Sequence, residues 1–82
     1  MDTIVVRFKN LRKNTEVDLD IPVTISANEL VIALNEAYEL GIDVSNIKSC
    51  YLQAENPITL LRGNKTIEEM GLRNGSIIYY TK

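Results

Sequence analysis

The sequence of 82 residues contains no histidine, no tryptophan and a single cysteine. Histidine is the usual general base near neutral pH and the commonest metal ligand, so its absence argues against catalysis and metal binding. Cys50 has no second cysteine to pair with, which excludes an internal disulfide and favours a cytoplasmic location. Because it has no histidine partner, we interpret it as a buried structural thiol and not as a nucleophile. We therefore expect no enzyme, no cofactor and no metal.

Long apolar runs and an excess of positive charge are absent as well. No apolar stretch approaches the roughly 20 residues that a membrane-spanning helix needs, and Asp2 stands where a signal peptide would carry basic residues. The formal net charge is −2, so the chain has no basic field that would bind nucleic acid. A chain of this length has room for one hydrophobic core, which predicts a single domain over residues 1–82.

Two stretches near the N-terminus, residues 3–10 and 16–21, alternate apolar and polar side chains, as half-buried strands do. A polar turn separates them, which predicts a hairpin. One register sets cations opposite anions twice: Lys9 opposite Glu16, and Arg7 opposite Asp18. Pro22 cannot donate a hydrogen bond to a neighbouring strand, so the second strand should lie, or end, at an edge of the sheet.

The clearest local signal is a helix start. Ser26 and Glu29 have the spacing of a capping box, and apolar residues flank it as a hydrophobic staple. Gly41 suits a left-handed helix end, so a helix is predicted at about residues 27–40. Its expected buried stripe consists of Leu30, Ala33, Leu34, Ala37 and Gly41.

The second half of the chain indicates three further strands. Residues 47–54 and 58–61 are interpreted as strands separated by a proline. A second capping box, closed at once by a glycine, predicts a short helical turn near residues 67–70. An Asn-Gly pair then leads into the last strand, residues 77–80.

Alternation along these strands gives the candidate binding residues. In the third strand, the inward residues are expected to be Cys50, Leu52 and Ala54, which leaves Tyr51 outward. In the last strand, Ile77 and Tyr79 are expected to point inward, and Ile78 and Tyr80 outward. Exposed tyrosines provide a large contact area for little conformational entropy, so the candidate partner-binding residues are Ile78, Tyr80 and Tyr51. The alternative is that these are ordinary apolar residues of the kind scattered over most protein surfaces, without a binding role.

A hairpin, a crossing helix and a last strand parallel to the first predict an α+β fold with one helix across a mixed four- to five-stranded sheet. The chain resembles the ubiquitin-like β-grasp superfamily over essentially its whole length. The resemblance rests on Ile4–Phe8, on the helix opening at Ile25–Glu29, and on Lys65–Leu72 before Asn74-Gly75. Within that superfamily it looks most like the bacterial YukD/EsaB family, in its length and in stopping at the final strand.

This resemblance implies an accessory role in type VII (WXG100, or ESAT-6-like) protein secretion in Gram-positive bacteria. The chain would act by docking protein partners of the secretion machinery, and in ubiquitin-like domains the open sheet face is the habitual docking surface. Two alternatives are a carrier activated at its C-terminus for conjugation or sulfur transfer, and a ubiquitin-like domain excised from a larger secretion component. The carrier is disfavoured because no terminal Gly-Gly follows the last strand, and Gly75 precedes it.

The sequence also bears on self-association. Asp18 and Asp20 on the second strand discourage strand-to-strand pairing, whereas residues 58–61 are apolar and less protected. We therefore expect a monomer or a weak dimer.

Overall fold

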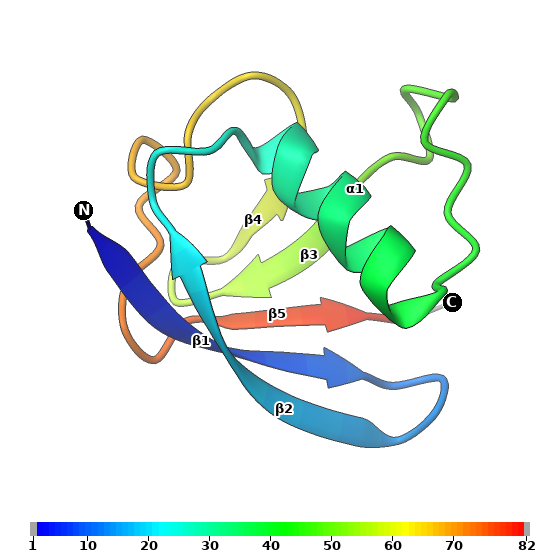
Figure 1. Cartoon of the computed structure of the whole chain (residues 1–82), viewed down its shortest axis with the longest axis horizontal. Coiled ribbons are helices and arrows are strands. Elements are labelled where there is room, and N and C mark those ends of the chain that lie inside the picture. Colours follow the sequence, from blue (N-terminus) through cyan, green and yellow to red (C-terminus); the bar gives the residue numbers. More distant parts are fainter. Residues whose placement is uncertain (1, 82) are drawn as a thin grey trace.

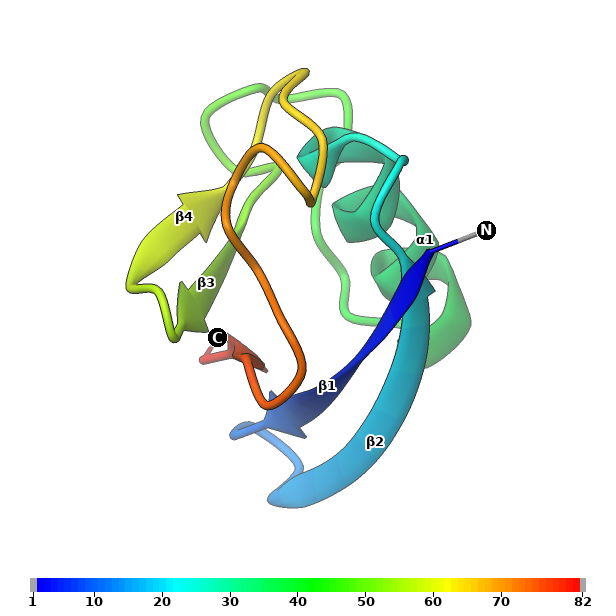
Figure 2. The same ribbon diagram turned by 90° about the vertical axis from the view of Figure 1, so that its left-hand side faces the viewer.

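In the computed structural model, which describes residues 2–81, five strands form one mixed sheet and a single helix crosses one of its faces (Figure 1). The elements are β1 (Thr3–Asn10), β2 (Thr15–Pro22), α1 (Ala27–Tyr38), β3 (Leu52–Glu55), β4 (Thr59–Leu61) and β5 (Ile77–Tyr80). The strand order is β2-β1-β5-β3-β4, so β2 and β4 are the edges. Seen from the side, the strands curve around the face that carries the helix (Figure 2). The predicted α+β arrangement is confirmed.

The N-terminal hairpin has the predicted register. Arg7 lies opposite Asp18 and Lys9 lies opposite Glu16, and β2 ends at Pro22 on the sheet edge. Both ion pairs come from Arg7, whose guanidinium lies 3.3 Å from the Asp18 carboxylate and 3.4 Å from that of Glu16. These side chains are about half exposed, and exposed pairs of this kind contribute about 0–1 kcal/mol each. The hairpin is therefore held mainly by its backbone ladder and its buried side.

Helix α1 starts as predicted. The Glu29 amide donates to Ser26 Oγ (3.0 Å) and the Ser26 amide donates to Glu29 Oε1 (3.1 Å), which completes the capping box. The helix ends at Tyr38, two residues before the approximate predicted end, and its left-handed cap is Glu39 (φ 52°) instead of Gly41. Asn35 holds the segment after the helix through two hydrogen bonds to Ile42. Its Oδ1 accepts from the Ile42 N–H (2.8 Å), and its Nδ2 donates to the Ile42 carbonyl (3.2 Å).

The buried stripe of α1 also differs from the prediction. The residues that face the sheet are Ala27, Leu30, Val31 and Leu34. Ala33 and Ala37 are exposed, because they lie on the helix beside this stripe and the spacing of three and four residues runs through Val31 instead. Half-buried Tyr38 continues the stripe, and its ring lies 5.1 Å from that of Phe8 on β1.

Strand β3 is shorter than expected, since it begins at Leu52 and residues 47–49 form a turn. The preceding loop forms turns of its own, in which Asp43 and Asn46 accept backbone hydrogen bonds from Ser45 (3.1 Å) and Lys48 (3.0 Å). The preferred face assignment is nevertheless confirmed: the buried residues are Cys50, Leu52 and Ala54.

The faces of β5 are the reverse of the prediction. Ile78 is fully buried and Tyr80 is 6% exposed, whereas Ile77 and Tyr79 are half-buried on the other face. The reason is the register with β1, in which Ile78 lies beside the buried Phe8. Side-by-side residues of paired strands point to the same face, so Ile78 points under the helix.

The segment before β5 contains the second capping box. Glu69 accepts hydrogen bonds from the Thr66 backbone N–H (3.0 Å) and hydroxyl (3.2 Å), and the Glu69 amide donates to Thr66 Oγ1 (3.1 Å). The predicted helical turn is present as a short series of hydrogen-bonded turns, which places Ile67 and Leu72 in the core. The backbone and side-chain hydrogen bonds from Thr66 lower the pKa of the Glu69 carboxyl.

This capping box makes stability depend on pH. A carboxyl whose pKa is lowered by folding stabilises the folded state above its ordinary pKa of about 4.3, and the effect is lost as the pH falls through the lowered value. We expect the thermal midpoint to fall between about pH 5 and pH 2, and to fall less in Glu69→Gln. Glu68→Gln removes an equal charge next to the box without touching Thr66, and is the control. Equal pH dependence of the wild type and Glu69→Gln would contradict this role.

Candidate protein-binding face

The structure separates the three predicted binding residues. Ile78 and Tyr80 are part of the core beneath α1, and the Tyr80 hydroxyl donates to the Leu40 carbonyl at 2.6 Å. Neither can contact a partner while the domain is folded, so their assignment to the surface is wrong. Tyr51 lies just before β3 and is half-buried, between the buried Cys50 and Leu52 in the chain.

A different row of side chains occupies the face of the sheet that the helix leaves open. Across four neighbouring strands, Lys9 lies beside Tyr79, Tyr79 beside Gln53, and Gln53 beside Leu60. These side chains share one face because they are register partners. With their further register partners, they form what we call the open sheet face: Val5, Arg7, Lys9, Glu16, Asp18, Asp20, Gln53, Glu55, Leu60, Ile77 and Tyr79.

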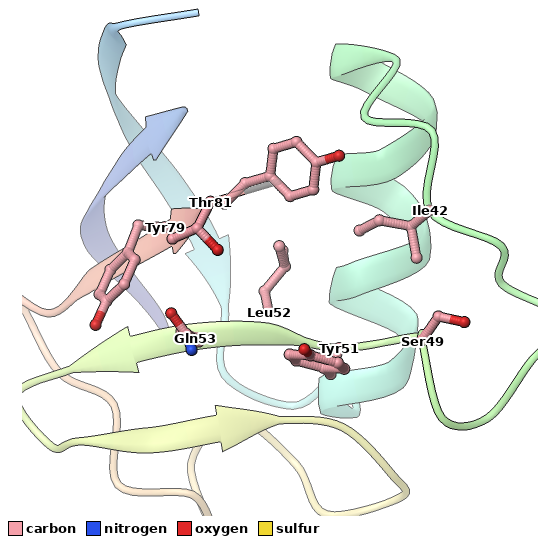
Figure 3. Close-up of a pocket in the computed structure, with 8 residues that line it drawn as sticks. Ile42, Ser49, Tyr51, Leu52, Gln53, Tyr79 and Thr81 are labelled. Carbon is pink, nitrogen blue, oxygen red and sulfur yellow. The ribbon is translucent and has the colours of Figure 1, made fainter. Parts of the chain in front are cut away.

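The open sheet face mixes apolar groups with charged groups of both signs, since Arg7 is ion-paired with Glu16 and Asp18 of β2. Val5 is 47% exposed and Leu60 is 41% exposed, and Ile77 and Tyr79 are half-buried between them. Figure 3 shows one end of this face, where Tyr79 and Gln53 extend from neighbouring strands. An aromatic ring among aliphatic and polar neighbours is the composition that protein interfaces favour.

The backbone beneath this face is firmly held. The Val5 amide donates to Asn74 Oδ1 (2.8 Å), and the Val5 carbonyl accepts from the Gly75 amide (3.0 Å). The fully buried Ser76 hydroxyl accepts from the Arg73 amide (2.9 Å) and donates to the Asn56 carbonyl. The turn before β5 is thus hydrogen-bonded both to β1 and to the loop after β3. A partner would therefore bind a preformed surface.

Cys50 has the buried position that its sequence context predicted. Its side chain is 4% exposed, and its Sγ donates to Asn28 Oδ1 at 3.3 Å. Burial raises the pKa of the thiol, and the negative charge of Asp43 raises it further. A thiol held protonated in this way is a poor nucleophile.

Residues 2–81 contain neither a metal-binding cluster nor a membrane-spanning helix. No cluster of three or more cysteine, aspartate and glutamate side chains could hold a metal ion there. The helix of this part of the chain lacks the length and apolar character that crossing a membrane requires.

The fold and the open face define a ubiquitin-like β-grasp domain, and solved structures agree. The C-terminal ubiquitin-like domain of mouse tubulin-specific chaperone e superposes with a TM-score of 0.72 at 12% identity, over 95% of this chain and 84% of that one. The ubiquitin-like domain of Plasmodium falciparum Dsk2 gives 0.62 at 17% identity, over 98% and 100%. A ubiquitin-like domain of Arabidopsis thaliana protein At2g32350 gives 0.67 at 14% identity, over 96% and 76%. At these identities the likeness establishes the fold alone.

The family follows from the sequence itself. The family described as "WXG100 protein secretion system (Wss), protein YukD" matches residues 4–79. The chain therefore belongs to the YukD family, which is associated with WXG100, or type VII, secretion. Among curated proteins no match is found.

Proposed function

We propose that this protein is a non-catalytic, cytoplasmic accessory protein of type VII secretion that docks a protein partner through its open sheet face. The observation that carries the proposal is the continuous row from Lys9 through Tyr79 and Gln53 to Leu60, which the helix leaves uncovered. Membership of the YukD family supports the link to secretion. The buried, protonated Cys50 supports action by contact and not by covalent chemistry.

Tyr79 is expected to be the main anchor of this interface. It lies at the centre of the row, between a lysine and a glutamine on its two neighbouring strands. Aromatic residues at the centre of an interface often contribute most of its binding free energy, because they exclude water over a large area. The aliphatic residues Ile77 and Leu60 would complete the apolar centre, and Arg7 and Lys9 would lie at its rim.

The test is co-purification of the tagged protein with WXG100 secretion components expressed together with it. Tyr79→Asp should reduce partner recovery about tenfold or more, since it places a charge at the centre of the interface. Ala37→Asp is the matched control: Ala37 is exposed on helix α1, which covers the other face of the sheet, and recovery should stay at the wild-type level. Thermal unfolding of each variant shows that it is folded. Full recovery with Tyr79→Asp would refute docking through the open sheet face.

A further inference from the structure

A second surface lies at the end of the domain that carries the start of helix α1. The loop 43–50 and the segment 62–65 both approach the first turn of the helix there (Figures 1 and 2). Between them is a groove, whose apolar side chains are Val44 and Ile47 and whose charged side chains are Lys48, Arg62 and Lys65. We call it the end groove.

The walls of the end groove are fixed by hydrogen bonds. The Ala27 amide donates to the Lys65 carbonyl (2.8 Å), and the Asn28 amide donates to the Gly63 carbonyl (3.0 Å). The bond from Cys50 Sγ to Asn28 Oδ1 ties the other wall to the same turn of the helix. Because these helix amides are already occupied, the positive character of the groove comes from its side chains and not from a free helix N-terminus.

The apolar side chains of the groove are unusually open to water. Ile47 is 85% exposed and Val44 is 40% exposed, although both lie in a loop whose turns are set by side-chain hydrogen bonds. Covering them would remove apolar area from water, which favours binding of an apolar group.

The charged side chains that line the groove are all positive. Three of the nine lysines and arginines line it, and no aspartate or glutamate does, in a chain whose net charge is −2. None of these three cations forms an ion pair within 4.0 Å with a residue from 2 to 81. Three acids of the adjoining segments are engaged in local hydrogen bonds: Asp43 accepts from Ser45, Glu29 accepts from Ser26, and Glu69, whose pKa Lys65 helps to lower, accepts from Thr66.

We propose that the end groove binds an acidic peptide segment that also carries apolar side chains, supplied by a partner protein. Its apolar groups would cover Val44 and Ile47, and its carboxylates would meet Lys48, Arg62 and Lys65. Opposite charges favour this occupant and exclude basic ones. The groove is separate from the open sheet face, so the domain can hold two segments at once, and the inference does not depend on the proposed function.

The proposal is tested with the whole chain and two short synthetic peptides. One alternates aspartate and glutamate with leucine; the other is identical except that asparagine and glutamine replace the acids. Titration of the isotope-labelled protein should shift the amide signals of Ile47, Lys48 and Asn64 with the acidic peptide. The affinity should fall several-fold when salt is raised to about 0.5 M, because exposed charges are then screened. Equal binding of the neutral peptide would overturn the charge-based assignment.

Matched variants locate the site. The double variant Lys48→Glu/Arg62→Glu should weaken the acidic peptide at least about tenfold. Arg12→Glu/Lys13→Glu changes the net charge equally at the β1–β2 turn, and should leave the affinity within about twofold. Ile47→Asn should also weaken binding, and because Ile47 is so exposed it should not unfold the domain. Equal losses in both double variants would show attraction by net charge only and would refute a site in the groove. Tyr79→Asp should bind the peptide normally, which separates this test from that of the sheet face.

Discussion

Replacing Ile78 by alanine is expected to destabilise the domain by about 3–4 kcal/mol. Ile78 is fully buried beneath α1, with Phe8 beside it on one neighbouring strand and Ala54 on the other. Truncation loses the transfer free energy of the removed methyl and methylene groups, and leaves a cavity that a sheet held on both sides cannot close. Because domains of this size have only about 5–10 kcal/mol in total, the loss should be plain in urea unfolding.

The neighbouring Ile77 provides the control. It has the same side chain, on the same strand, but points to the open sheet face and is only half-buried. Ile77→Ala should cost less than about 1 kcal/mol, as is usual for partly exposed positions. The ratio of the two losses therefore reports which face of β5 is buried. Equal losses, or a larger loss at Ile77, would contradict the register between β5 and β1.

Tyr80→Asp is expected to unfold the domain at room temperature. Tyr80 is 6% exposed, and aspartate would remove a large ring from the core and place a carboxylate there without a partner. Losses above about 4 kcal/mol arise from this combination of a cavity and a buried unpaired charge. Far-UV circular dichroism and the dispersion of amide signals measure the result. Failure of this variant to bind a partner would thus report unfolding and not a lost contact.

Tyr80→Phe is the conservative counterpart. It keeps the ring and removes only the hydroxyl that donates to the Leu40 carbonyl (2.6 Å), a bond that joins β5 to the segment after the helix. The expected cost is about 1–2 kcal/mol, because one buried hydrogen bond is lost and a carbonyl is left without this donor. A stable, well-dispersed Tyr80→Asp protein would contradict the buried position of this residue.

Much of the fold could be predicted because its signals are local. The capping boxes at Ser26–Glu29 and Thr66–Glu69 involve residues three apart, and both are formed. The hairpin register needs only the alternation of two adjacent strands and their opposite charges, and it too is correct. The left-handed cap lies at Glu39 instead of Gly41 because Asn35 bonds to Ile42 across the turn, a contact that competes with the signal of Gly41.

The open sheet face could not be predicted in the same way. The four residues Ile77–Tyr80 are two isoleucines followed by two tyrosines, so alternation gives no preference between the two faces. The choice is made by the turn before β5, where Asn74 and Gly75 bond to Val5, about seventy positions earlier in the chain. A one-residue shift of that turn would exchange the buried and the open residues, and nothing within the strand itself would prevent it.

By itself, the sequence therefore determined which segments are strands and helix, how the hairpin pairs, and that the chain resembles a ubiquitin-like domain of the YukD family. Only the tertiary structure decided that Tyr79 and Ile77 face outward, and that Lys48, Arg62 and Lys65 gather around one groove. The physical reason is the separation along the chain of the residues that interact. Caps, turns and alternating burial are set by residues a few positions apart, whereas the face of a central strand and the walls of a groove depend on contacts between distant segments.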